Sequence, residues 1–120
     1  MRKYYLMKKT SYIRFLNFVQ AIENIAIEDQ LDRVEESLLN HVAIRQSQGQ
    51  ELLVNDLILN SSFGSQATLH KRVKTMVLKG YIELNVDAQD GRKKRVLLTP
   101  KAHYYFERLS DLLDKAAKVS

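Results

Sequence analysis

The sequence predicts a mainly α-helical (α+β) single domain with five helices and one β-hairpin. Apolar residues recur at helical spacing through most of the chain, whereas strict alternation of apolar and polar residues is confined to one short segment. The 120 residues include one proline and four glycines, so long loops are not expected. A chain of this length buries roughly 65% of the surface that its unfolded form exposes, enough for a core without disulfides.

Helical spacing is clearest at the start of the chain, where two helices are predicted over residues 11–28 and 29–46. Apolar residues of the first recur every three or four positions, at Tyr12, Phe15, Val19, Ile22 and Ala26. Those of the second fall on one face, at Leu31, Val34, Leu38 and Val42. Three acidic residues of this helix are expected to lie outside, namely Asp32, Glu35 and Glu36. Acidic residues in a first turn favour the positive end of the helix dipole.

Two further helices follow at short intervals. A turn over residues 46–50 leads to a short third helix at 54–59, and a polar turn over 60–64 leads to a fourth helix at 65–79. The serines of the polar turn can cap the fourth helix, and Gly80 is a natural left-handed stop after it. The apolar residues expected to face inward from the fourth helix are Leu69, Val73, Met76 and Val77.

A hairpin and a last helix complete the predicted elements. Residues 81–86 alternate between polar and apolar side chains, residues 95–98 form the returning strand, and the Asp90-Gly91 pair between them is a hairpin signal. Thr99 and Pro100 then begin a helix, because threonine caps well and proline at the first position loses no hydrogen bond. That helix runs to about residue 118, with its apolar stripe at Ala102, Phe106, Leu109, Leu113 and Ala116.

This order of elements is that of a winged helix-turn-helix, in which the third and fourth helices are joined by a short turn and followed by a hairpin. A helix about 10–12 Å across fits a major groove about 12 Å wide. The outward face and tip of the fourth helix carry side chains suited to that groove: Ser65, Gln66, Thr68, His70, Lys71, Arg72, Lys74 and Thr75. The sequence therefore predicts that this helix reads double-stranded DNA.

The hairpin adds four consecutive basic residues, Arg92, Lys93, Lys94 and Arg95. Alternation along a strand would place Arg92 and Lys94 on one face, and Lys93 and Arg95 on the other. A thin basic ribbon can follow phosphates or place an arginine in the narrow minor groove. A solvated basic turn without any partner is the alternative interpretation.

Charge is distributed unevenly along the chain, whose formal net charge is +5. Residues 61–108 carry ten basic side chains against four acidic ones, whereas residues 23–60 carry eight acidic side chains against two basic ones. Such asymmetry is expected of a polyanion-binding surface backed by a separate support. A solvated lysine-rich face would give the same counts.

The hairpin also carries a family signature. Asp90-Gly91-Arg92, followed by Leu98-Thr99 and the small Ala102, resembles the wing of MarR-type transcriptional regulators. Upstream residues resemble the recognition helix of that family and the start of its wing, namely Thr68-Leu69, Val73, Met76 and Gly80-Tyr81-Ile82. The helix that precedes the recognition helix in that family is matched by Leu53, Val54, Asp56 and Leu57. The resemblance covers about residues 31–102.

The resemblance implies a transcriptional regulator that binds double-stranded DNA. Arg92 would enter the minor groove, Asp90 would orient that arginine or brace the wing, and residues 65–75 would read the major groove. Ala102 stands where the family usually has glycine, and the turn before the recognition helix is one residue longer than usual. A final dimerisation helix of many members is not recognised here, which leaves the dimer geometry open.

The terminal helices favour a homodimer. Their apolar stripes are broader than a small domain needs, and the spacing suits packing against a partner helix. The residues assigned to the interface are Tyr12, Phe15, Val19, Ile22, Phe106, Leu109 and Leu113. In the alternative, both helices simply complete the monomer core.

The predicted division is residues 1–30 as N-terminal helix, 31–98 as winged-helix core and 99–120 as C-terminal helix.

Several function classes are excluded or disfavoured. The absence of cysteine excludes disulfides, zinc–thiolate sites and thiol catalysis, and suits a reducing, cytoplasmic location. His41, His70 and His103 fall in three different helices without ligand spacing, and no glycine-rich phosphate loop occurs. We therefore expect no enzyme activity, no metal and no cofactor. No apolar run approaches the roughly 18 residues of a membrane span.

Two alternatives to the binding of duplex DNA remain open at this point, and so does the question of an effector. The chain could be a winged-helix interaction or assembly module, for instance in a replication or phage complex. Binding of RNA or single strands would need exposed aromatic platforms, for which only Tyr81 lies near the basic block. The family often senses small aromatic compounds, and Tyr12, Phe15, His41 and Tyr105 could line such a cleft, although core packing explains them equally well.

Overall fold

The computed structural model describes residues 6–59 and 61–118. Its elements are α1 (Ser11–Glu28), α2 (Arg33–Ser47), α3 (Val54–Ile58), the short 3-10 helix η1 (Ser61–Phe63), α4 (Gln66–Leu78), β1 (Ile82–Val86), β2 (Lys94–Leu98) and α5 (Pro100–Ala117). Five α-helices and a two-stranded antiparallel sheet form the winged-helix layout, so the predicted fold class is confirmed. No helix in these two ranges has the length and apolar character needed to span a bilayer.

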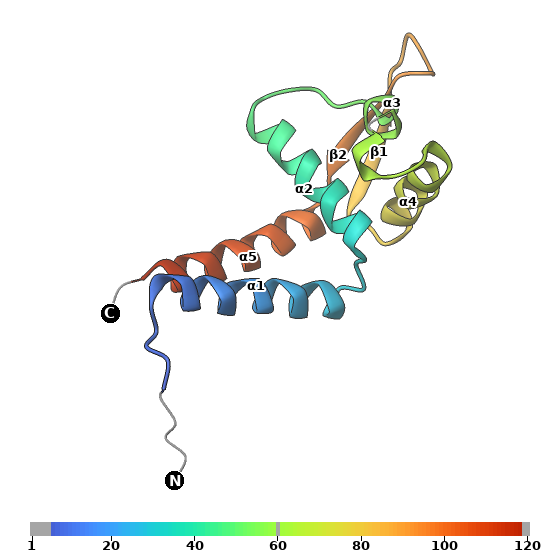
Figure 1. The fold of residues 1–120 in the computed structure, drawn as a ribbon. Helices are drawn as coiled ribbons and strands as arrows, with labels where there is room; N and C mark the ends of the chain where they lie inside the picture. The colour runs from blue at the N-terminus through green and yellow to red at the C-terminus, as the bar shows by residue number, and fades with distance from the viewer. Residues whose placement is uncertain (1–5, 60, 119–120) are drawn as a thin grey trace.

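The two terminal helices lie side by side at one end of the molecule (Figure 1). The other helices and the hairpin form the body above them, and the turn of the hairpin projects from the opposite end (Figure 1). In this body α4 packs against α2, α3 and β1. The helix pair and the projecting hairpin are therefore separated by the core of the winged helix.

The core draws on every helix and on both strands. Its fully buried large side chains include Leu39, Leu57, Leu69 and Val96, together with the two tyrosines Tyr81 and Tyr105. The rings of Tyr81 and Tyr105 meet edge to face with centroids 6.1 Å apart, which joins the start of the hairpin to α5. Burial of such side chains contributes about 1.5–3 kcal/mol each.

The hairpin is regular and one of its edges is covered. Ile82 pairs with Leu98 at the base, and Val86 pairs with Lys94 near the tip. On the outer edge of β2, the Val96 amide donates to the Leu52 carbonyl at 2.9 Å. This contact ties the segment before α3 to the sheet and leaves less of the edge free to pair with another chain.

The predicted start of the second helix was wrong. That helix begins at Arg33 rather than at residue 29, because Asp32 caps it by accepting the Glu35 amide at 2.8 Å. Before the cap, Gln30 takes a left-handed φ of 58° and the Leu31 amide donates back to the Ala26 carbonyl. The chain therefore turns between α1 and α2 instead of continuing as helix. The other helices and strands agree with the sequence to within about one residue at each end.

Two side chains, Glu35 and Val77, were assigned to the wrong environment. Glu35 was expected outside but is 1% exposed, because its carboxylate is paired with Lys79. Val77 was expected to face inward but is 37% exposed, since it lies at the edge of the buried face of α4. Tyr81 is fully buried and cannot serve as an aromatic platform for a single strand.

Candidate nucleic-acid interface

The N-terminus of α4 is fixed by a serine cap. The Ser65 hydroxyl accepts the Thr68 amide at 3.2 Å and donates to the Thr68 hydroxyl at 2.9 Å. Gln66, Ala67 and Thr68 follow the cap and are exposed. A helix N-terminus also presents amide groups and the positive end of its dipole. This end of α4 is therefore suited to a negatively charged partner.

The buried side of α4 determines which residues face outward. Leu69, Val73 and Met76 are buried against the core, so the opposite face of the helix points to solvent. Five of the residues predicted to bind DNA are exposed on that helix, namely Gln66, Thr68, His70, Lys71 and Lys74. This exposed face therefore carries side chains that can form hydrogen bonds, and it also carries two positive charges, those of Lys71 and Lys74.

Two predicted site residues on α4 are engaged within the protein instead. The Thr75 hydroxyl donates to the Lys71 carbonyl at 2.9 Å, within the helix. The Arg72 guanidinium lies 2.9 Å from the Asp32 carboxylate at the start of α2. Arg72 therefore lies on the flank of α4, as the sequence indicated, but it contacts α2 rather than projecting beside His70.

The tip of the wing holds an aspartate–arginine pair. Asp90 Oδ1 accepts the Arg92 amide at 3.1 Å and Arg92 Nε at 3.3 Å. The Arg92 side chain is nevertheless 92% exposed. The carboxylate therefore holds the Nε edge of the guanidinium, while the rest of the Arg92 side chain is open to solvent.

Arg95 has a different environment from its three basic neighbours. Its Nη2 lies 2.8 Å from an Asp87 oxygen, and its Nε donates to Glu51, which precedes α3. The Arg95 hydrogen bond and then the amides of Gln89 and Asp90 lower the pKa of Asp87 to about 2. The contacts with Asp87 and Glu51 fix the turn of the hairpin and attach the hairpin to the segment before α3, so Arg95 stabilises the wing.

A groove of about 500 Å³ separates the wing from α4. Its charged and polar lining includes His70 and Lys74 from the helix, and Arg92 and Lys94 from the wing. The two wing residues share this side, as strand alternation predicted. Asn55, in the first turn of α3, also lines the groove and was missed by the sequence analysis, because a lone asparagine in a short helix carries no distinctive signal. A polyanionic strand would meet cations from both sides of this groove.

The predicted dimer residues fall into two groups. Phe106 and Leu109 pack against the core, and Val19 and Ile22 are half-buried. In contrast, Tyr12 is 66% exposed, and Phe15 and Leu113 are each 50% exposed. The terminal helices thus complete the monomer core with one side and leave aromatic and aliphatic side chains uncovered on another.

The four residues suggested for an effector cleft lie in separate environments. Tyr105 is buried against Tyr81 and Phe106, whereas His41 contacts the ring of Phe63. Tyr12 and Phe15 stack on each other on the exposed side of α1. These contacts do not bring the four side chains into one cleft. In the described part of the chain, no three His, Asp or Glu residues are placed to hold a metal ion.

Comparison with known proteins identifies this fold. No protein-family model matches the sequence, and no curated protein matches it significantly. Solved structures do match. A Staphylococcus aureus MepR–DNA complex superposes with a TM-score of 0.68 at 21% identity, covering 88% of this chain and 78% of that chain.

Two further similar structures contain small molecules. S. aureus MepR bound to ethidium bromide has a TM-score of 0.59 at 20% identity, covering 88% of this chain and 76% of that chain. S. aureus MarR in complex with salicylate and kanamycin has a TM-score of 0.61 at 19% identity, covering 84% of this chain and 64% of that chain. The chain therefore has the winged helix-turn-helix fold of the MarR-type regulators that its wing signature resembles.

Proposed function

We propose that this protein is a sequence-specific transcriptional regulator that binds double-stranded DNA as a homodimer. The observation that carries the proposal is the groove between α4 and the wing, where His70 and Lys74 face Arg92 and Lys94. The MepR–DNA complex supports it, since that protein has the same fold and binds DNA. The groove alone would suit any polyanion; the exposed, capped N-terminus of α4 favours duplex DNA.

The exposed residues divide into two roles. Gln66, Thr68 and His70 lie in the N-terminal half of α4, where a recognition helix meets base edges in the major groove. The lysines on α4 and on the wing carry charge without a fixed pattern of donors, so they contact phosphates. Arg92 enters the minor groove beside the major-groove contacts, guided by Asp90.

The dimer forms through the terminal helices. The uncovered side chains Tyr12, Phe15 and Leu113 lie on α1 and α5, and this helix pair is at the opposite end of the molecule from the turn of the wing (Figure 1). Burial of an aromatic or aliphatic side chain at an interface supplies the free energy that a stable dimer needs. A two-fold dimer presents two copies of α4 to two half-sites, which doubles the contacts with a palindromic operator.

The test is selection of bound sequences from random duplex DNA at near-physiological salt, followed by affinity measurements across salt concentration. We expect enrichment of a palindromic site and a steep salt dependence, because each contacted phosphate releases counterions. The same selected site with scrambled half-sites is the control. Weak, salt-insensitive binding with no enriched sequence would overturn the proposal in favour of a protein-interaction module.

We extend the proposal to regulation by a small aromatic compound. The salicylate complex of MarR and the ethidium complex of MepR support this step. Salicylate is the better probe here because ethidium itself intercalates between base pairs. Titration of salicylate into the DNA-free protein, followed by calorimetry, should show saturable binding, and salicylate should then release the selected duplex. Absence of both effects would remove this part of the proposal.

A further inference from the structure

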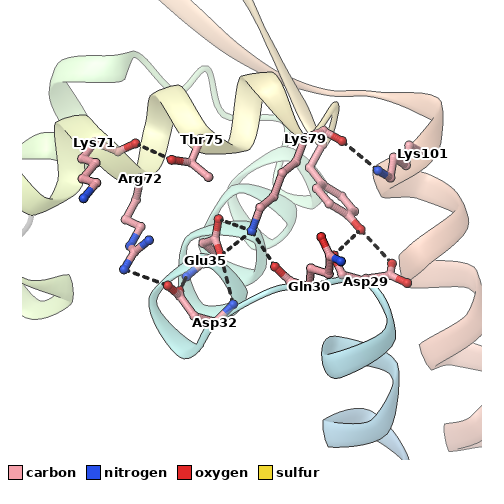
Figure 2. A network of polar contacts seen from close by, with 10 residues as sticks. Asp29, Gln30, Asp32, Glu35, Lys71, Arg72, Thr75, Lys79 and Lys101 are labelled. Atoms are coloured by element: carbon pink, nitrogen blue, oxygen red, sulfur yellow. Dashed lines mark hydrogen bonds and ion pairs between the residues drawn. The ribbon is translucent and has the colours of Figure 1, made fainter.

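The turn between α1 and α2 contacts the recognition helix at two points (Figure 2). At the first, Arg72 Nη2 lies 2.9 Å from Asp32 Oδ2. At the second, the Lys79 ammonium donates to the Gln30 carbonyl. Arg72 and Lys79 are seven residues apart, so they share one face of the helix and lie about 10 Å apart along its axis. A helix held at two such points cannot pivot freely about either.

The second point includes a buried carboxylate. Glu35, in the first turn of α2, has a side chain that is 2% exposed, and the Lys79 ammonium lies 2.9 and 3.0 Å from its two oxygens. One of these oxygens also accepts the Asp32 amide at 3.0 Å. Glu35 therefore joins the backbone of the turn to the C-terminal end of α4.

The same turn is attached to the helix pair at the other end of the molecule. Asp29 ends α1, and its carboxylate accepts Arg108 Nη2 of α5 at 2.8 Å. Its second oxygen accepts the Tyr81 hydroxyl at 2.8 Å, just beyond α4. A continuous set of polar contacts thus runs from α1 and α5, through residues 29–35, to the recognition helix.

We propose that residues 29–32 together with Glu35 form a positioning bracket. This bracket holds the angle between α4 and the α1–α5 pair, and so sets which half-site spacing the dimer prefers. The inference rests on the proposed function, because spacing has meaning only for a dimer on DNA. In a two-fold dimer built on α1 and α5, that angle determines the distance between the two recognition helices. Arg72 is then a positioning residue rather than a reader of bases.

The first test measures spacing preference. Asp32→Asn removes the charge that pairs with Arg72 but keeps a good N-cap for α2. Arg72→Gln removes the other partner, and Lys71→Gln is the matched control, since it removes a positive charge from an exposed neighbour on α4. Affinities are measured for duplexes that carry identical half-sites at the selected spacing and at one base pair more or less.

We expect Asp32→Asn and Arg72→Gln to weaken the preference for the selected spacing about two- to fivefold, the range for a partly exposed ion pair. Arg72→Lys should restore part of the preference. Lys71→Gln should lower all affinities by a similar factor and leave the preference unchanged. If Arg72→Gln behaves like Lys71→Gln, Arg72 is a phosphate contact and the bracket is overturned.

The second test needs no DNA. The sequence has no cysteine, so Gln20→Cys on α1 and Ala67→Cys on α4 provide two specific sites for spin labels. In labelled protein diluted with unlabelled protein, the label–label distance distribution should broaden in Asp32→Asn and Arg72→Gln but not in Lys71→Gln. Unchanged widths would overturn the bracket. If the distributions broaden in these variants but the parent protein binds no duplex DNA, the positioning bracket is supported. Only the proposed function is then overturned.

Discussion

The Lys79 ammonium lies 2.9 Å from the Glu35 carboxylate, whose side chain is only 2% exposed. The lysine is the C-cap of α4, and the glutamate lies in the first turn of α2. A carboxylate removed from water in this way depends on its positive partner and on the Asp32 amide, which also donates to it. The pair therefore contributes both to the stability of the fold and to the placement of α4.

Removing one partner of the Glu35–Lys79 pair should lower the free energy of unfolding more than removing both partners. Lys79→Met leaves the Glu35 charge buried without its counterion, and we expect it to lower the free energy of unfolding by about 3 kcal/mol, the lower end of the range for buried pairs. In a Glu35→Gln background the same change should cost clearly less, because the neutral glutamine leaves no buried charge without a counterion and can still accept the Asp32 amide. Urea unfolding of the parent, both single variants and the double variant checks this. Additive losses would contradict it.

The wing should be insensitive to acid until low pH. The pKa of Asp87 is lowered from 3.8 to about 2 by Arg95 and by the amides of Gln89 and Asp90. Because the folded pKa lies below the unfolded one, this stabilisation is present above about pH 4 and is lost as the pH falls toward 2. An NMR titration of the Asp87 carboxyl should therefore have a midpoint near 2. Arg95→Gln should raise it toward 3.8, and a midpoint near 4 in the parent would contradict the prediction.

Arg92 should affect sequence preference, whereas Lys93 should not. On a selected operator, Arg92→Ala should cost about 1–3 kcal/mol of binding and relax the preference for A·T pairs beside the major-groove contacts. Arg92→Lys should rescue only part, since lysine lacks the planar guanidinium that Asp90 orients. Titrations use that operator and a G·C-flanked counterpart.

The matched control is Lys93→Ala, at the adjacent exposed position. It should weaken binding to both duplexes similarly and reduce the salt slope by about one unit, as loss of one phosphate contact does. Lys94→Ala should behave in the same way. If Arg92→Ala and Lys93→Ala gave the same pattern, the minor-groove role of Arg92 would be wrong.

Charge on the uncovered side of the terminal helices should prevent dimerisation. Light scattering at micromolar concentration should give about twice 13.9 kDa for the parent, and Phe15→Glu with Leu113→Glu should shift the mass toward the monomer. The reason is that a charge buried at an apolar interface without a partner is strongly unfavourable. Val86→Glu, at a 53% exposed position on the wing, should leave the dimer intact. A monomeric parent would contradict the prediction.

The sequence by itself determined the features whose causes are local. Ser65 and Thr99 cap their helices through hydrogen bonds to residues three positions away, and both helix starts could be predicted to within one residue. The serines of the 60–64 turn were expected to cap α4, but the cap is Ser65, the next residue along the chain. Asp90 and Arg92 pair across two residues and could also be predicted. The apolar periodicity of α4 likewise indicated its buried face, apart from Val77 at the edge of that face.

Tertiary structure alone decided which charged residues are structural. Glu35 occupies a position in the buried stripe between Leu31 and Leu38, a spacing that could have signalled its burial, but its partner Lys79 is 44 residues away. Asp29 and Arg108 are 79 residues apart. Side-chain chemistry indicates that a carboxylate needs a cation, but the sequence offers 19 lysines and arginines. Only the packing of α1, α2, α4 and α5 brings particular partners within hydrogen-bonding distance, because such contacts depend on the relative placement of whole helices.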